Sequence, residues 1–102
     1  MKPNEFLDGL CRDIICICVP QKILLFSYKQ SPDGELHSVK LCVIIGDGDS
    51  RMIERKLYVE VDSVLSFDIL VYTEAEWSQL LENNMSFASR IQKTGRVLYE
   101  AD

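Results

Sequence analysis

The sequence has 102 residues, of which 47% are hydrophobic and 26% are charged, and its formal net charge is −5. This length corresponds to one domain with a substantial core, so we take residues 1–102 as a single domain. The excess of acidic residues argues against nucleic-acid binding, which needs clustered Lys and Arg to neutralise phosphates. No apolar run approaches the ~18 residues of a membrane span, and no secretory signal is visible. We therefore expect a cytoplasmic protein without membrane association.

The first half of the chain predicts one helix and two strands. Apolar residues recur at helical spacing over residues 4–18, and Pro20 ends that pattern. Residues 22–29 have the continuous apolar character of a buried strand, and the Ser-Pro-Asp-Gly sequence at 31–34 is typical of a turn. A second strand is predicted over residues 38–45.

The second half predicts three helices and two strands. Residues 50–65 contain valines that favour a strand, but an apolar repeat of three or four residues predicts a helix throughout. Residues 67–72 predict a strand. The capping box that begins at Thr73 then opens a short helix through Glu82. A further helix over 86–93 ends at Gly95, and a terminal edge strand follows.

This order of elements, αββαβαα and a terminal strand, predicts an α+β (α/β-like) domain in which helices pack on one mixed sheet.

Trp77 and Leu81 lie four residues apart on the predicted short helix, with Leu80 adjacent. They could form an apolar association surface. The alternative is that Trp77 anchors its helix to the core.

The cysteines and acidic pairs give weak indications of chemistry. Cys16-x-Cys18 does not have the Cys-x-x-Cys spacing of zinc or redox motifs, and His37 is the single histidine. We expect all four cysteines to act as small buried hydrophobic residues. The pairs Asp33-x-Glu35 and Asp47-x-Asp49 are minor candidates for metal binding, because each offers too few ligands.

Two segments near the C-terminus resemble the small prokaryotic nucleotidyltransferases of the polymerase-β-like superfamily. Residues 67–77 resemble the family stretch "vDvvvvTpeEw", and residues 86–100 resemble its closing segment "SFvrralreGrvLYe". In the family, a first strand ends "lFGSyARG" and a second contains "SDiDLlvv". Residues 23–28 stand in the first position. Counting without gaps from Ser27 places the paired aspartates of the second motif at Ser38 and Lys40.

Nucleotidyl transfer needs divalent metals that neutralise charge developing on the phosphoryl group. The resemblance implies that two carboxylates on the second strand and one on the third would hold them, and Asp68 matches the third. Ser38 and Lys40 replace the other two, and Phe26 stands where the glycine before Ser27 is expected. A unit charge pair at ~4 Å is worth roughly 4 kcal/mol at an effective dielectric of ~20, so Lys40 would repel a metal ion.

The resemblance therefore implies a degenerate domain, with Ser27, Ser38, Lys40 and Asp68 as vestigial site positions, no catalytic residue and no metal or cofactor. The expected function is binding, either to a helical HEPN-type protein, as in toxin–antitoxin-like modules, or in a homodimer. An alternative is a residual nucleotidyltransferase or nucleotide-binding protein that uses Mg²⁺ and ATP or another NTP, with Ser27 and Lys40 contacting the nucleotide. A third possibility is a purely structural oligomerisation module. We also expect the Lys40 ammonium to lie within about 4 Å of Asp68.

Overall fold

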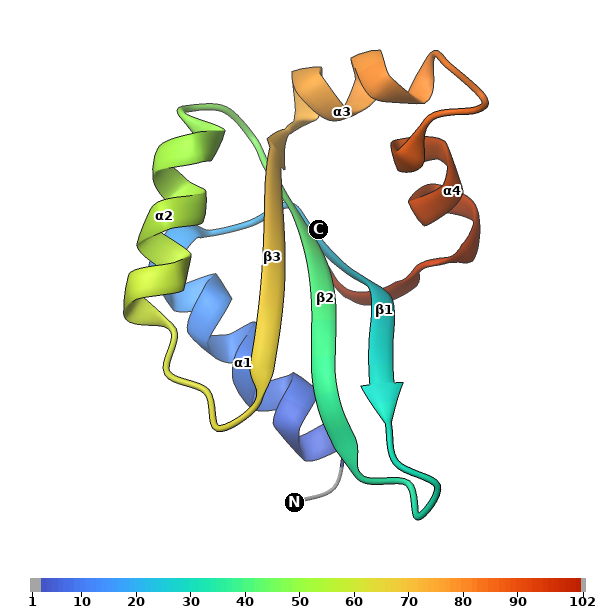
Figure 1. Ribbon diagram of the computed structural model, residues 1–102. Helices are drawn as coiled ribbons and strands as arrows, with labels where there is room; N and C mark the ends of the chain where they lie inside the picture. Colours follow the sequence, from blue (N-terminus) through green and yellow to red (C-terminus); the bar gives the residue numbers. More distant parts are fainter. Residues whose placement is uncertain (1–2, 102) are drawn as a thin grey trace.

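The computed structural model describes residues 3–101, with side chains from residue 5 onward. Its elements are α1 (Pro3–Cys18), β1 (Lys22–Gln30), β2 (Leu36–Ile45), α2 (Ser50–Glu60), β3 (Ser66–Thr73), α3 (Glu74–Leu81), α4 (Phe87–Thr94) and β4 (Arg96–Glu100) (Figure 1). This order confirms the predicted α+β fold, with helices packed on a mixed sheet. Among the described residues, no helix combines the length and apolarity needed to cross a membrane.

The sheet has the strand order β3-β2-β1-β4. Strand β1 is antiparallel to both of its neighbours, whereas β2 and β3 are parallel and are joined by the crossover helix α2. The predicted contact between the second and third strands is therefore confirmed. In this pairing Lys40 lies opposite Asp68, and Ile45 lies opposite Thr73.

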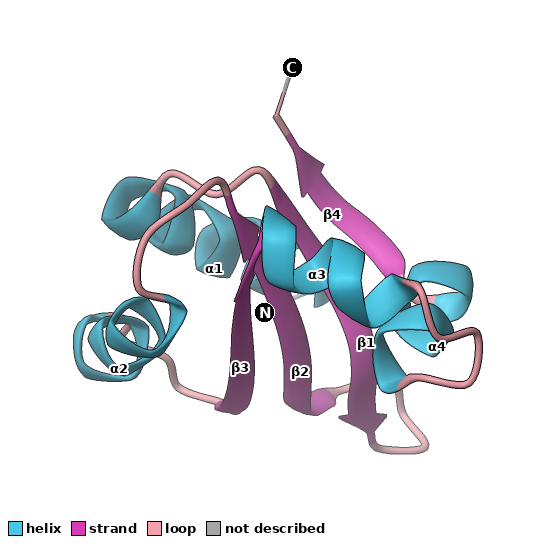
Figure 2. Cartoon of the chain, turned by 90° about the horizontal axis from the view of Figure 1, so that it is seen from above, coloured by secondary structure: helices cyan, strands magenta, loops and turns pink. Residues whose placement is uncertain are grey.

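Helices cover both faces of the sheet, with α1 and α2 on one side and α3 and α4 on the other (Figure 2). The larger core lies under α1 and α2 and includes Ile14, Leu41, Leu57 and Ile69, all at 0% exposure. The smaller core joins β1 and β2 to α3 and α4; its buried members are Leu24, Cys42, Ile44, Trp77, Ala88 and Ile91. Each fully buried aliphatic side chain contributes roughly 1.5–3 kcal/mol, so both layers are held by apolar burial.

Helix α2 is shorter than the sequence predicts. It ends at Glu60, and Val61 is an extended cap residue with φ −77° and ψ 121°. Val64 then lies in the connecting loop with 88% of its surface exposed. The apolar repeat extended the prediction to residue 65, but the valines favour extended backbone, and the Ser63 hydroxyl forms a local turn with Leu65.

The predicted N-terminal cap of α3 and the predicted C-terminal cap of α4 are confirmed. The Thr73 hydroxyl accepts the Glu76 N–H at 3.1 Å, and the Glu76 carboxylate accepts the Thr73 N–H at 2.8 Å, which completes the capping box. Gly95 is the C-cap of α4 and donates its N–H to the Ile91 carbonyl at 2.7 Å. A Cβ on Gly95 would lie 2.6 Å from that carbonyl oxygen, so only glycine fits without a backbone shift.

The four cysteines are all free thiols, but they are not all buried as predicted. Cys11 and Cys42 are buried, whereas Cys18 is half-buried and Cys16 is exposed. Burial raises the pKa of the Cys42 thiol to about 12. Burial, and then the Asp8 carboxylate, raise the pKa of Cys11 to about 11. These two thiols are therefore core side chains.

Candidate functional site

The predicted site positions lie together on one face of the sheet. Ser27, Lys40 and Asp68 are register partners, meaning that they lie opposite one another on adjacent strands, and they form one row across β1, β2 and β3. Ser38 lies in the next row, opposite Ser66. Side chains alternate along a strand, and Cys42 is buried under α3 and α4, so Lys40 and Ser38 point to that same face.

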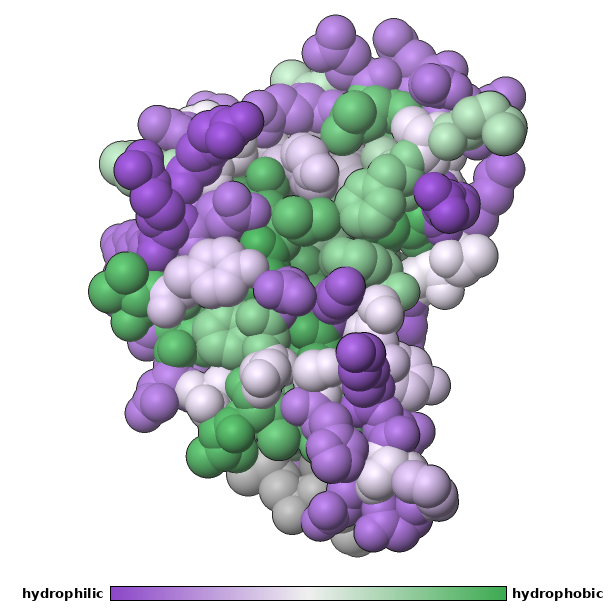
Figure 3. Space-filling view, viewed as in Figure 1, coloured by the Kyte–Doolittle hydropathy of each residue, from purple (hydrophilic) through white to green (hydrophobic). Residues whose placement is uncertain are grey.

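The row is not covered by the helices on its face. Helices α3 and α4 pack over the upper part of this face in Figure 1, and none of the three row residues belongs to the core beneath these helices. Ser27, Lys40 and Asp68 are consequently exposed, and Ser38 is half-buried. Figure 3 shows apolar surface in the middle of this face and hydrophilic surface toward the β1–β2 hairpin.

The predicted ion pair between Lys40 and Asp68 is wrong. Both residues are described, and no salt bridge within 4.0 Å joins them, although they are register partners. Both side chains are exposed, so water solvates each charge, and fixing a long lysine side chain would cost conformational entropy. The strand register was therefore predicted correctly, but the contact was not.

This row supplies one carboxylate where a two-metal centre would need several. Across residues 5–101, no group of three or more His, Cys, Asp or Glu side chains is arranged to hold a metal ion. The register partner of Asp68 on β2 is a cationic residue, Lys40, and not a second carboxylate. The arrangement can bind an ionic group through its cation, carboxylate and hydroxyl groups, but it does not gather the hard oxygen ligands that Mg²⁺ prefers.

One carboxylate of each of the two other acidic pairs accepts local hydrogen bonds. Asp33 accepts hydrogen bonds from the Ser31 hydroxyl and from the Glu35 N–H, and the Ser31 bond lowers the pKa of this carboxyl. Asp49 is the N-cap of α2 and accepts the N–H groups of Arg51 and Met52, each at 3.1 Å. These carboxylates stabilise a turn and a helix end, a use that the Asp49-Ser50 sequence before the helix indicates.

An aromatic pair, Phe26 and Phe87, begins next to Ser27 in β1 and was not predicted from the sequence. Phe26 lies at a register shift in β1 and contacts Phe87 of α4 edge-to-face, with ring centroids 5.4 Å apart. Phe87 is 41% exposed. The resemblance pointed to Phe26 only as a replacement for glycine. Its packing depends on α4, which is distant in sequence.

Trp77 does not form the predicted association surface. It is 6% exposed, packs in the smaller core and donates its indole N–H to the Gln92 side-chain oxygen at 3.3 Å. The tilted ring of Tyr72 lies beside it, with centroids 5.6 Å apart. The alternative is therefore correct: Trp77 anchors α3.

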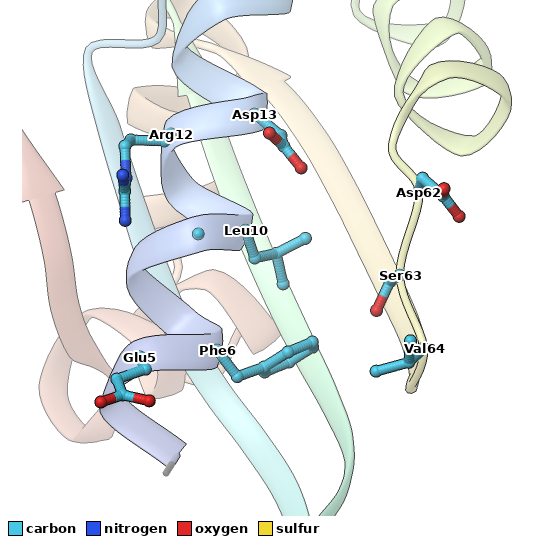
Figure 4. Close-up of a pocket in the computed structure, with 9 residues that line it drawn as sticks. Glu5, Phe6, Leu10, Arg12, Asp13, Asp62, Ser63 and Val64 are labelled. Carbon is cyan, nitrogen blue, oxygen red and sulfur yellow. The ribbon is translucent and has the colours of Figure 1, made fainter. Parts of the chain in front are cut away.

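A separate hollow of about 360 Å³ lies on the opposite, α1 side of the sheet. Figure 4 shows Phe6 and Leu10 pointing from α1 toward the loop that carries Val64, with Asp62 at the margin. The Ser63 hydroxyl on this loop is engaged with the backbone of Leu65. This hollow contains none of the predicted site residues.

Comparison with known proteins gives the chain no family: no known protein family, curated protein or solved structure was found to match it.

Proposed function

We propose that this chain is a nucleotidyltransferase-like protein that does not catalyse nucleotidyl transfer and acts by binding another protein. The observation that carries the proposal is that Lys40 stands beside Asp68 in one row of the sheet. By the resemblance, that row is where a second metal-binding carboxylate belongs. A cation at this position opposes the binding of a divalent ion.

The electrostatic effect of this replacement opposes the binding of a metal ion. Replacing a carboxylate with an ammonium changes the local charge by two units. Each unit interaction is worth roughly 4 kcal/mol at ~4 Å and an effective dielectric of ~20. Solvent screening reduces this figure because Lys40 and Asp68 are exposed, but its sign still opposes metal binding.

Exposed apolar side chains on α3, α4 and the loop between them support a binding role. Phe87 packs on Phe26, which precedes Ser27 in β1, and Leu80 and Met85 are exposed on α3 and the loop that follows it. The resemblance suggests a helical HEPN-type partner, as in toxin–antitoxin-like modules, or a homodimer. Tagged protein should then recover one stoichiometric helical protein from its native host, or should run as a dimer by light scattering.

The catalytic part of the proposal is tested with radiolabelled ATP, Mg²⁺ or Mn²⁺, and candidate protein acceptors. The expected result is no label transfer by the wild-type chain. The control is Asp68→Asn, which removes the remaining carboxylate. Transfer by the wild type that disappears in Asp68→Asn would contradict the proposal, because it would show a working metal-dependent centre.

Nucleotide binding without transfer is the alternative. It is favoured by the register of Ser27 opposite Lys40, which places a hydroxyl and an ammonium side by side on one face. An ammonium can hold a phosphate without a metal. Calorimetry with ATP, with and without Mg²⁺, tests this alternative. Metal-independent binding that is lost in Lys40→Gln would support it over the pure interaction module.

A further inference from the structure

Strand β1 is only partly covered along one of its edges. Strand β4 pairs with β1 from Lys22, opposite Glu100, to Leu25, opposite Arg96. Strand β2 covers the other edge of β1 as far as Gln30. Within the described chain, residues 26–30 therefore have no strand on the β4 side, and Figure 1 shows the lower half of β1 as a free edge of the sheet.

A hollow of about 570 Å³ adjoins this free edge. Its apolar lining comes from α1, β1 and the start of β2, and Arg96 adds a cation; the main residues are Leu7, Leu25, Phe26, Tyr28, Leu36 and Arg96. The ring of Tyr28 is 55% exposed. The edge thus combines unpaired backbone with an apolar recess for side chains.

Two backbone N–H groups on the opposite edge of the sheet are bonded by the protein's own side chains. On β3, the Tyr58 hydroxyl accepts the Ile69 N–H at 2.8 Å, and the Glu76 carboxylate accepts the Thr73 N–H at 2.8 Å. Proteins commonly block sheet edges in such ways, because an open edge pairs with other chains. Among the described residues, no side-chain hydrogen bond caps the backbone of the free part of β1. The Gln30 side-chain amide donates instead to the Gly34 carbonyl in the following turn.

We propose that an extended, acidic segment of a partner protein adds to the sheet beside residues 26–30 of β1, continuing the line of β4. This inference rests on the proposed interaction role and names its surface. Backbone hydrogen bonds to β1 would provide affinity, and every second side chain of the segment would enter the hollow.

Charge determines the choice of occupant. Arg96 lines the hollow and Lys29 projects from the free part of β1, whereas the lining includes no Asp or Glu among the described residues. A second copy that paired through this edge would bring another Lys29 and Arg96 against the first pair. Like charges across paired strands are destabilising, so the edge favours a foreign segment that carries carboxylates.

The test uses the full chain labelled with ¹⁵N and a capped eight-residue peptide of alternating threonine and valine that carries two glutamates. The control peptide has lysines in place of the glutamates. We expect the acidic peptide to shift the amide signals of residues 26–30 and to slow their hydrogen exchange. We expect the basic peptide to bind at least about tenfold more weakly, which corresponds to ~1.4 kcal/mol.

Charge-reversal variants locate the contact. Arg96→Glu should weaken the acidic peptide by about tenfold and strengthen the basic one. Arg55→Glu is the matched control, because Arg55 is exposed on α2, away from this edge, and carries the same charge change. It should leave both affinities unchanged. The amide spectrum of each variant shows whether it is folded.

Three results would overturn the inference: equal binding of both peptides, signal changes confined to β3 or to α3 and α4, or concentration-dependent protection of residues 26–30 without peptide. The last result would identify a second copy as the occupant.

These outcomes are independent of the label-transfer assay. An active enzyme that binds the acidic peptide would refute only the proposed loss of catalysis, and an inactive protein that does not bind it would refute only the edge.

Discussion

The hydroxyl of Tyr58 on α2 accepts a hydrogen bond from the backbone N–H of Ile69 on β3, at 2.8 Å. The Tyr58 ring also stacks on Phe67, with centroids 5.6 Å apart and an interplanar angle of 13°. One side chain thus joins the crossover helix to the sheet and satisfies an amide that faces away from β2. The two contacts can be separated experimentally, because Phe keeps the ring and removes the hydroxyl.

Tyr58→Phe should lower the free energy of unfolding by about 1 kcal/mol and accelerate hydrogen exchange of the Ile69 amide. The loss arises because the edge amide then has only water as a partner. Tyr28→Phe is the control, since Tyr28 is exposed on β1 and should have an effect below about 0.5 kcal/mol. An unchanged Ile69 exchange rate in Tyr58→Phe would show that this hydrogen bond is not formed in solution.

Gly95 and Gly9 should respond in opposite directions to replacement by alanine. A Cβ at Gly95 meets the Ile91 carbonyl oxygen at 2.6 Å, so Gly95→Ala should destabilise the fold by about 1–3 kcal/mol. A Cβ at Gly9, inside α1, has no atom within 4 Å, so Gly9→Ala should stabilise it by about 0.5–1 kcal/mol. Denaturant unfolding measures both changes. Equal effects of the two variants would contradict the steric argument.

Val19 is strained by its backbone conformation. Its φ of 47° lies in the left-handed region, where a β-branched residue is rare, and its side chain is 77% exposed at the end of α1. Val19→Gly should therefore raise the free energy of unfolding by about 1 kcal/mol. Val64→Gly is the matched control: Val64 is also exposed, but it lacks a positive φ. A gain of similar size in both variants would argue against strain at Val19.

Local signals predicted most of the fold. Residues within a few positions of one another determine the capping box at Thr73 and Glu76, the glycine end of α4 and the apolar strands. These features could therefore be predicted from short stretches of sequence. The end of α2 was missed because Val61 and Val64 continue an apolar repeat while their branched side chains favour extended backbone. There, two local preferences disagreed, and periodicity was the weaker one.

Contacts between distant segments could not be read in the same way. The row of Ser27, Lys40 and Asp68 followed from a correct register, but the geometry of exposed side chains depends on solvation, and the Lys40–Asp68 ion pair did not form. Tertiary packing determines the contact between Phe26 and Phe87 and the partial coverage of β1 by β4. No periodicity within either segment indicates them.

The buried thiol of Cys42 should make stability depend on pH in the alkaline range. Its pKa rises from 9.0 to about 12 in the folded state because burial disfavours the thiolate. Below pH 9 both states hold the proton. Above it the unfolded chain releases the proton first, so the free energy of unfolding should fall as pH rises from about 9 to about 12. Cys42→Val should flatten this decline, whereas Cys16→Ser, at an exposed position, should not. Identical pH profiles for wild type and Cys42→Val would contradict the assignment.

The last prediction restores the carboxylates that the resemblance assigns to the second strand. In the double variant Ser38→Asp with Lys40→Asp, two carboxylates would lie on one face of β2, and the one at position 40 would stand opposite Asp68. Three anions in adjacent rows repel one another, so the variant should be less stable than wild type without metal. Mn²⁺ or Mg²⁺ should then stabilise it, by about 2.7 kcal/mol at a concentration one hundred times the Kd. Thermal unfolding with and without Mn²⁺, together with calorimetry, measures this effect.

Adding Asp68→Asn to the double variant should reduce the gain, because the third ligand is then lost. If the folded double variant shows no metal-dependent shift, the row is not a metal site that lost its ligands, and the assignment of Ser38 and Lys40 to the family's aspartates is wrong.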